Sequence, residues 1–170
     1  MHDFLLKYDV NTFLDAPCGD WNWLQTIKFP ETVQYIGADI VKDLVEKNER
    51  DYSSDKITFQ HLDITKDSLP KVDMWMCRDC LLHLSQELVF LVLENFVSSK
   101  SKYFLASCHP DAKFNKNIVT GRNAPINLLK PPYSLPDPID QIVDYKPPRL
   151  RKHLMLWTHQ QIKEVVEQRL

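Results

Sequence analysis

Apolar residues gather in five short runs over the first two-thirds of the chain, and each run is rich in β-branched or aromatic side chains. Several runs are apolar at nearly every position, which is typical of strands covered on both faces in a parallel sheet. The pattern predicts five strands, at Thr12–Asp15, Val33–Asp39, Ile57–Asp63, Val72–Cys77 and Lys102–Ser107.

Segments that suit helices lie between and after these strands, at Trp21–Ile27, Val41–Glu49, Gln86–Val97 and Thr158–Leu170. Ser85 stands where it can cap the third helix, and Thr158 with Gln161 fits a capping box for the last one. The alternation of strands and helices indicates right-handed crossovers and an α/β fold with a doubly wound, mostly parallel sheet.

Length, charge and cysteine use narrow the class of protein. The 170 residues suit one domain, 1–170, and 21 Lys+Arg against 23 Asp+Glu are too balanced to indicate nucleic acid as a partner. No apolar run approaches the roughly 20 residues of a membrane span, and the start Met1-His2-Asp3 does not resemble a signal peptide. The four cysteines fit free thiols. We therefore expect a cytoplasmic protein with no membrane partner.

Most of the eleven prolines lie in residues 110–149, which opposes long helices and interior strands there. Long connections with little regular structure are usually functional. We expect residues 110–153 to form an insertion or lid.

Three predicted strands end in an acidic residue, namely Asp15, Asp39 and Asp63. In a doubly wound sheet, ligands bind outside the carboxyl ends of the strands, so neighbouring strands would bring these carboxylates to one crevice. Asp39 lies 24 residues after Asp15, about where an acidic residue accepts hydrogen bonds from ribose hydroxyls. The alternative for each aspartate taken alone is a turn former or helix cap.

The turn after the first predicted strand carries the most specific motif, Asp15-Ala16-Pro17-Cys18-Gly19-Asp20-Trp21-Asn22-Trp23. Gly19 would let backbone N–H groups approach a ligand closely. Pro17 and Trp21 stand in this turn at places where glycine-rich ligand-binding turns often have further glycines. Their presence argues against the pyrophosphate cradle of a G-x-G-x-x-G turn, and hence against NAD.

This turn resembles motif I of the class I S-adenosylmethionine (SAM)-dependent methyltransferases, in the variant of a bacterial-type group that carries a D-x-P-C-G-D-W/F-N-W turn. The resemblance continues through residues 35–41, 62–65, 72–73 and 77–85, and it weakens in the proline-rich stretch. It implies a Rossmann-like sheet with strand order 3-2-1-4-5 and SAM as the cofactor. It also implies methyl transfer to an unidentified acceptor, for which we expect a small molecule rather than a macromolecule.

The resemblance further implies roles for individual residues. Asp39 would hold the ribose, Asp63 the adenine, and the turn from Asp15 to Gly19 the methionine portion. Arg78 could hold a carboxylate of the cofactor or of the substrate through its fork of donors. The expected cofactor-binding residues are Asp15, Pro17, Cys18, Gly19, Trp23, Asp39, Ile40, Asp63, Ile64 and Arg78. For Trp23, the residues alone favour packing of the first helix on the sheet.

Asp79 and His83 are the candidate catalytic residues. They are four residues apart at the start of a predicted turn or helix, so they can share one face, and either can take the acceptor's proton. In the alternative, Asp79 is a cap and His83 a packing residue. Cys77, Cys80 and His83 have the spacing of a partial zinc site, but the fourth ligand has no obvious source, and we expect no metal.

The proline-rich stretch supplies the expected substrate contacts, Arg122, Asn123 and Tyr133. The basic run Lys146–His153 has two interpretations. One is attraction of an acidic acceptor, and the other, which we favour, is a solvated surface loop.

The end of the sequence leaves other functions open. In class I methyltransferases a helix such as Thr158–Leu170 leads to two more strands, whereas this sequence stops at Leu170. Either residues from 110–153 complete the sheet, or the terminal antiparallel pair is missing and an open edge favours pairing with another copy. A non-catalytic SAM-binding module completed by a partner is the second hypothesis, and an NAD-dependent oxidoreductase is the third.

Overall fold

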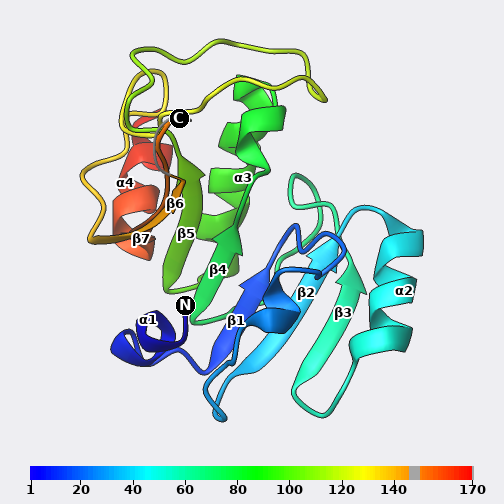
Figure 1. Cartoon of the computed structure of the whole chain (residues 1–170). Helices are drawn as coiled ribbons and strands as arrows, with labels where there is room; N and C mark the ends of the chain where they lie inside the picture. The colour runs from blue at the N-terminus through cyan, green and yellow to red at the C-terminus, as the bar shows by residue number, and fades with distance from the viewer. Residues whose placement is uncertain (146–149, 170) are drawn as a thin grey trace.

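A seven-stranded sheet with the order β3-β2-β1-β4-β5-β7-β6 forms the centre of the computed structural model, which describes residues 1–145 and 150–169 (Figure 1). The first five strands are parallel to one another. They are β1 (Thr12–Asp15), β2 (Gln34–Asp39), β3 (Ile57–His61), β4 (Met74–Cys77) and β5 (Tyr103–Cys108). The predicted strands and their order 3-2-1-4-5 are confirmed, and their carboxyl ends meet at one edge of the sheet.

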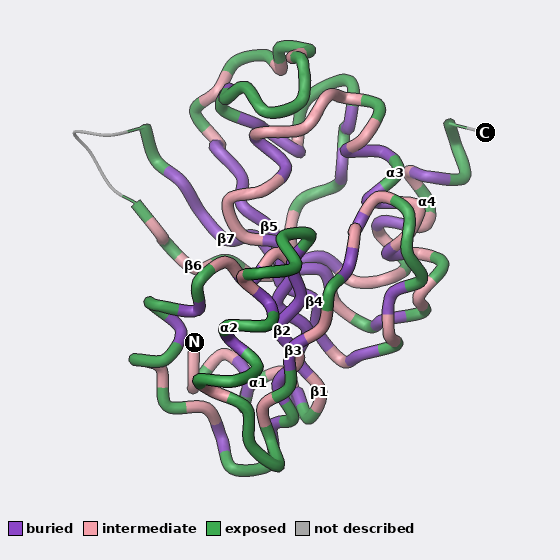
Figure 2. The backbone as a smooth tube through the Cα atoms, turned by 90° about the vertical axis from the view of Figure 1, so that its right-hand side faces the viewer, coloured by how far each residue is buried: buried purple, intermediate pink, exposed green. Residues whose placement is uncertain are grey.

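Alternation of side chains along each strand divides the core into two clusters. Trp75 and Cys77 of β4 point to one face, while Met74 and Met76 point to the other. The first face packs against α3 (Gln86–Ser99) and α4 (His159–Arg169), and the second against α1 (His2–Lys7) and α2 (Lys42–Tyr52). Because helices cover both faces, the inner strands are buried almost throughout (Figure 2).

Local capping fixes where the two long helices of the first face begin. The Ser85 hydroxyl accepts a hydrogen bond from the Leu88 N–H at 3.3 Å. Thr158 and Gln161 cap each other reciprocally: the Thr158 N–H donates to the Gln161 side chain at 3.0 Å, and the Gln161 N–H donates to the Thr158 hydroxyl at 3.3 Å. Both predicted caps are confirmed.

The predicted helix at Trp21–Ile27 is wrong. This segment holds only a short 3-10 helix, Leu24–Thr26. Trp21 adopts a left-handed backbone conformation with φ of +57°, which an α-helix cannot contain, and its side chain is buried in the second cluster. The demands of the turn therefore override the apolar pattern.

The terminal antiparallel pair is present, so the possibility that the fold lacks it is wrong. β6 (Asp140–Tyr145) lies at the edge, and β7 (Lys152–Thr158) fits between it and β5, antiparallel to both. The chain therefore completes its own sheet before the last helix. The edge strand on this side is β6 rather than β5, and the possible homo-oligomer through a sheet edge stays a prediction.

The basic run Lys146–His153 is not a surface loop along its whole length. Lys152 and His153 are buried in β7, and Arg151 pairs with Asp111. Residues 146–149 of the run lie outside the described residues. Within the described ranges, no helix combines the length and the apolar content that a membrane crossing requires.

Candidate functional site

The turn after β1 is tied to β2 by hydrogen bonds. The Cys18 N–H donates to the Ala38 carbonyl at 2.8 Å, and the Gly19 N–H donates to Oδ2 of Asp39 at 3.0 Å. The other oxygen of Asp39 accepts the Val41 N–H at 3.0 Å. From α2, the buried Asn48 amide donates to the Gly19 carbonyl at 2.8 Å. The turn is thereby fixed before any ligand arrives.

Gly19 leaves open space at the ligand side of this turn. Its φ is +59°, a conformation that side chains disfavour, and no atom lies within 4 Å of the position that a Cβ would occupy. The backbone can therefore approach a bound molecule closely at this point.

Asp15, at the end of β1, has one unused oxygen. Its Oδ2 accepts a hydrogen bond from the Tyr35 hydroxyl at 2.8 Å, whereas Oδ1 is buried and has no hydrogen-bond partner among the described residues. Burial raises the pKa of Asp15 to about 8, although the hydrogen bond from Tyr35 and the charge of Arg78 oppose the rise. Asp15 is thus an acid poised to ionise when a cation approaches.

A cavity of about 290 Å³ opens at this edge of the sheet. Its walls bring together eight of the predicted site residues with Asp20, and the full lining is Asp15, Pro17, Cys18, Gly19, Asp20, Trp23, Asp39, Arg78 and Asp79. Four of these residues carry carboxyl groups and only one carries a cation. The cavity is therefore acidic.

Three other predicted cofactor residues do not line this cavity. Ile40 follows Asp39 with an exposed side chain, and Ile64 is buried in the core. Asp63 lies beyond β3 at the same edge as Asp39, because the Leu62 N–H donates to the Asp39 carbonyl. Oδ1 of Asp63 accepts both the backbone N–H and the hydroxyl of Thr65. These bonds outweigh the effect of burial and lower the pKa of Asp63.

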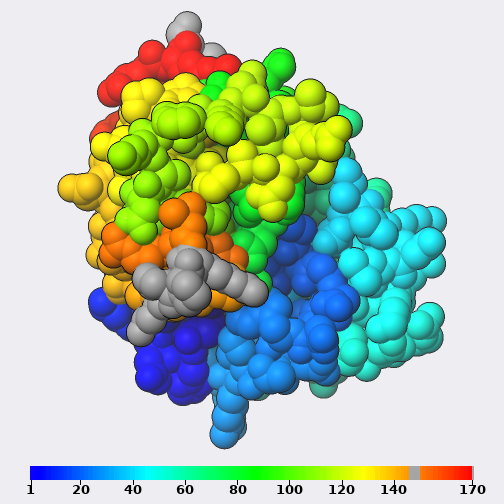
Figure 3. Space-filling model, turned by 45° about the horizontal axis from the view of Figure 1, so that its top comes forward, coloured from blue at the N-terminus to red at the C-terminus, as the bar shows by residue number. Residues whose placement is uncertain are grey.

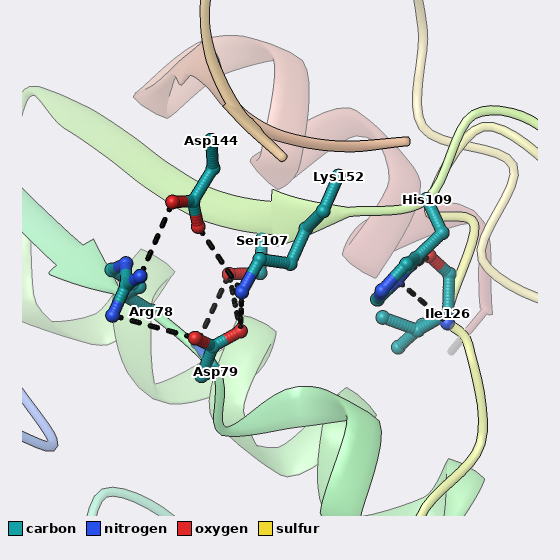
Figure 4. A network of polar contacts seen from close by, with 7 residues as sticks. All are labelled: Arg78, Asp79, Ser107, His109, Ile126, Asp144 and Lys152. Carbon is teal, nitrogen blue, oxygen red and sulfur yellow. Dashed lines mark hydrogen bonds and ion pairs between the residues drawn. The ribbon is translucent and has the colours of Figure 1, made fainter. Parts of the chain in front are cut away.

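A network of four charged side chains adjoins the cavity (Figure 4). Arg78 lies 3.2 Å from Asp144 of β6 and 3.4 Å from Asp79. Lys152 of β7 pairs with Asp79 and lies 3.1 Å from Asp144. The Ser107 hydroxyl at the end of β5 accepts the Asp79 N–H at 2.9 Å. Both strands of the terminal pair therefore contribute to this wall of the site.

Burial strengthens the interactions in this network. Burial opposes the charge on Arg78, but the hydrogen bond and charge of Asp144 outweigh it and raise the pKa of Arg78. His109 lies nearby with its Nδ1 3.3 Å from the Ile126 N–H (Figure 4). Burial, with the charge of Lys152 adding to it, lowers the pKa of His109.

Asp79 and His83 do not lie on one helical face. Asp79 has a left-handed φ of +53° and precedes a 3-10 helix, Leu81–His83, so the four-residue spacing of an α-helix does not apply. Asp79 lines the cavity, whereas Nδ1 of His83 lies 2.9 Å from the Arg122 carbonyl. The structure brings Asp79 alone to the cavity.

The two tryptophans of the turn have different places. Trp21 is buried against Tyr35, Tyr52 and Phe59. Trp23 lines the cavity and stacks on the Arg78 guanidinium, whose central carbon lies 4.6 Å from the centre of its ring. The packing role favoured for Trp23 therefore belongs to Trp21.

The predicted substrate contacts differ in exposure. Arg122 and Asn123 are exposed in the proline-rich segment, whereas Tyr133 is buried against Phe90. All four cysteines are free thiols. In the described part of the chain, no group of three His, Cys, Asp or Glu side chains is placed to hold a metal ion.

Comparisons with known proteins show which solved structures share the fold of this chain. No protein-family model matches the sequence, and a comparison with curated proteins finds no match. Human N-acetylserotonin methyltransferase in complex with SAM superposes with a TM-score of 0.62 at 16% identity, over 88% of this chain and 47% of that one. The fold is that of SAM-dependent methyltransferases.

Two bacterial structures agree on this methyltransferase fold. Magnesium protoporphyrin IX methyltransferase from Synechocystis PCC 6803, with bound S-adenosylhomocysteine (SAH), has a TM-score of 0.62 at 13% identity, over 92% and 78% of the two chains. The 1,6-didemethyltoxoflavin-N1-methyltransferase of Burkholderia thailandensis, with bound 1,6-didemethyltoxoflavin and SAH, has a TM-score of 0.61 at 14% identity. The match covers 86% of this chain and 70% of that one. The chain spans about half the length of the human enzyme.

Three residues of this site were missed from the sequence. Asn48 stands in a polar stretch of a helix, and nothing there signals a buried amide. Asp144 and Lys152 belong to strands that were not predicted. A signal for Lys152 exists, since a lysine directly before the apolar run 154–157 suits the start of a buried strand.

Replacing Asp15 tests the state of its carboxyl group. The folded protein, with a pKa of about 8, holds one proton more than the unfolded chain between that pH and the ordinary value of 3.8. Its free energy of unfolding therefore falls as pH rises from about 4 to 8, by at most about 1.4 kcal/mol per unit. In urea unfolding, Asp15→Asn should be more stable than the natural protein at pH 8, with the gain shrinking towards pH 5. Asp20→Asn, at an exposed position of the same turn, is the control; a destabilised Asp15→Asn at pH 8 would contradict the assignment.

Replacing Lys152 tests the network. The side chain is only 7% exposed, and Lys152→Met leaves Asp144 and Asp79 with one cation fewer. We expect a loss of about 2 kcal/mol in the free energy of unfolding, because Asp79 and Asp144 keep only Arg78 of the two cations that they share. Lys163→Met, which removes an exposed pair with Glu167, should cost less than about 0.5 kcal/mol. Equal effects of the two substitutions in urea titrations would show that the network does not stabilise the fold.

Proposed function

We propose that the protein is a SAM-dependent methyltransferase and that the acidic cavity at the Gly19 turn holds its cofactor. The observation that carries the proposal is the lining of this cavity, which has four carboxyl groups and one guanidinium, itself paired with Asp144. SAM carries a sulfonium and an ammonium, which carboxylates attract. The pyrophosphate of NAD would meet repulsion instead.

The residues present fit this cofactor. Oδ1 of Asp15 is buried, unpartnered and free to accept the ammonium. Asp39 uses one acceptor position on each oxygen for backbone N–H groups, which leaves further positions for the ribose hydroxyls. We assign the adenine side to Ile40, Asp63 and Ile64, which follow β2 and β3 at the same edge. When bound, the cofactor supplies an electrophilic methyl group.

The acceptor side of the reaction belongs to the wall made by β4, β6 and β7. Asp79 is our candidate for the group that takes the acceptor's proton, since it lines the cavity and is 37% exposed at its side chain. Lys152 and Arg78 hold its two oxygens in place. His83 is the second candidate, from the neighbouring loop. The main contribution of these groups is to position the reactants and exclude water.

The expected lid at residues 110–153 ends before β6, because residues 140–145 and 152–153 belong to the sheet. We propose a small molecule as the acceptor and residues 110–139 as an acceptor-side lid that includes Arg122, Asn123 and Tyr133. The names of two structural neighbours, for N-acetylserotonin and for 1,6-didemethyltoxoflavin, denote enzymes of small molecules. The free thiols fit a cytoplasmic protein. The non-catalytic alternative was motivated by missing terminal strands, and β6 and β7 remove that motive.

Titration calorimetry with SAM tests the cofactor assignment. Asp39→Ala should weaken SAM binding at least tenfold, because the ribose loses its acceptor and the Gly19 N–H loses its partner. Asp55→Ala removes the same charge at an exposed position outside the cavity and should change the affinity less than threefold. NAD should leave the thermal unfolding midpoint unchanged, whereas SAH should raise it. An Asp39→Ala protein that binds SAM as tightly as the natural one would overturn the proposal.

A further inference from the structure

A second cavity, of about 330 Å³, lies in the proline-rich segment that follows β5. Figure 3 shows this segment, in yellow-green, at the upper part of the molecule, beside the green atoms of the middle of the chain and apart from the blue and cyan atoms of the first strands. Six of the nine lining residues are apolar, namely Ala112, Phe114, Ile118, Ala124, Pro125 and Leu150. The cavity is distinct from the one at the Gly19 turn, with which it shares no lining residue.

Cations surround this apolar cavity. Lys113 and Lys116 belong to its lining, and Arg122 and Lys130 follow in the same segment. Residues 112–130 contain no acidic residue, although the chain as a whole has a net charge of −2. Within the described ranges, none of the four cations forms an ion pair, while the neighbouring Asp111 is taken by Arg151. The described residues therefore leave the positive charge at the rim without a neutralising ion pair.

Two asparagines hold the cavity walls in a fixed shape. Asn127 is 1% exposed, and its amide donates to the carbonyls of Ala112 at 2.8 Å and Pro110 at 3.1 Å. Asn115 binds both the N–H and the carbonyl of Asn127, at 2.8 and 2.9 Å. These bonds replace those of regular secondary structure. The cavity is consequently preformed, which lowers the entropy lost on binding.

The opposite wall is anchored to the loop before α3. The Ala124 N–H donates to the Leu82 carbonyl at 3.1 Å, and the Gly121 N–H to the His83 carbonyl at 2.9 Å. Phe114 stands at the rim with 65% of its surface exposed. An exposed aromatic ring beside a preformed apolar cavity is available to cover a bound molecule.

We propose that this cavity binds a small amphipathic anion. The apolar body of the ligand occupies the space between Ile118, Ala124 and Leu150, and its anionic group pairs with Lys113 and Lys116. The cavity volume is at the lower end of the range for small-molecule sites, which suits a compact aromatic or short alkyl body. Asn123, which we assign to the acceptor side, also lines this cavity. The inference nevertheless goes beyond the proposed methyl transfer and does not depend on it.

A small molecule fits these observations better than a membrane surface. The apolar atoms line a concavity, whereas a bilayer requires apolar side chains that project together from a convex face. Of the exposed apolar residues nearby, Phe114 and Leu150 belong to the cavity lining, and Val119 lies outside it.

Fluorescence titration with 1-anilinonaphthalene-8-sulfonate, an aromatic anion, tests the proposal. The natural protein should bind the dye at one saturable site, and decanoate should displace it at least tenfold more effectively than uncharged decan-1-ol. The double variant Lys113→Gln/Lys116→Gln should weaken dye binding about fivefold or more. Phe114→Ser should weaken it independently of charge.

A matched variant separates the cavity from net charge. Lys28→Gln/Lys71→Gln removes two exposed lysines that lie outside this segment and should change dye binding less than twofold. All variants should keep the thermal unfolding midpoint and the SAH affinity of the natural protein, so a failure here is distinct from a failure of the cofactor assignment. Equal weakening by the two double variants would overturn the proposal. So would co-sedimentation with phosphatidylglycerol vesicles in the absence of saturable dye binding, which would indicate a membrane surface.

Discussion

The carboxylate of Asp39 links the turn after β1 to the backbone that follows β2, and the site depends on these two hydrogen bonds. One oxygen accepts the N–H of Gly19 from the turn after β1, and the other accepts the N–H of Val41 beyond β2. Asp39 is only 7% exposed, so these bonds are shielded from water and strengthened by the low local dielectric. They set the distance between the turn, with Asp15 and Pro17, and the end of β2. The acidic cavity lies in the space thus fixed.

Charge is distributed unevenly along the carboxyl edge of the sheet. Over β1 and β2 the carboxyl groups are mostly unpaired with cations, and burial keeps Asp15 protonated near neutral pH. Over β4 and β5 the acids Asp79 and Asp144 are matched by Arg78 and Lys152. Beyond β5 the proline-rich segment is basic. Such a gradient orients a cationic cofactor at one end and accommodates anionic groups at the other.

Local signals account for what could be predicted from the sequence. The five parallel strands were predictable because both their faces are buried, and the caps at Ser85 and Thr158 were predictable because a cap involves only neighbouring residues. β6 and β7 were not, since Lys152 and His153 interrupt the apolar pattern and are buried only through partners far along the chain. The site residues of the turn after β1 were predictable because they follow one another in a short motif. Asp79 and His83 were wrongly expected to share a face, because Asp79 has a left-handed backbone conformation that no pattern of residue types reveals.

Backbone NMR gives the most direct test of the central claim that SAM binds at the Gly19 turn. The chain has only three glycines, so their amide signals are few and can be followed individually through a SAM titration. The account predicts a large, saturable shift of the Gly19 signal, with the Gly121 signal, in the proline-rich segment, unchanged. A saturable shift at Gly121 with Gly19 unmoved would place the cofactor elsewhere and contradict the account.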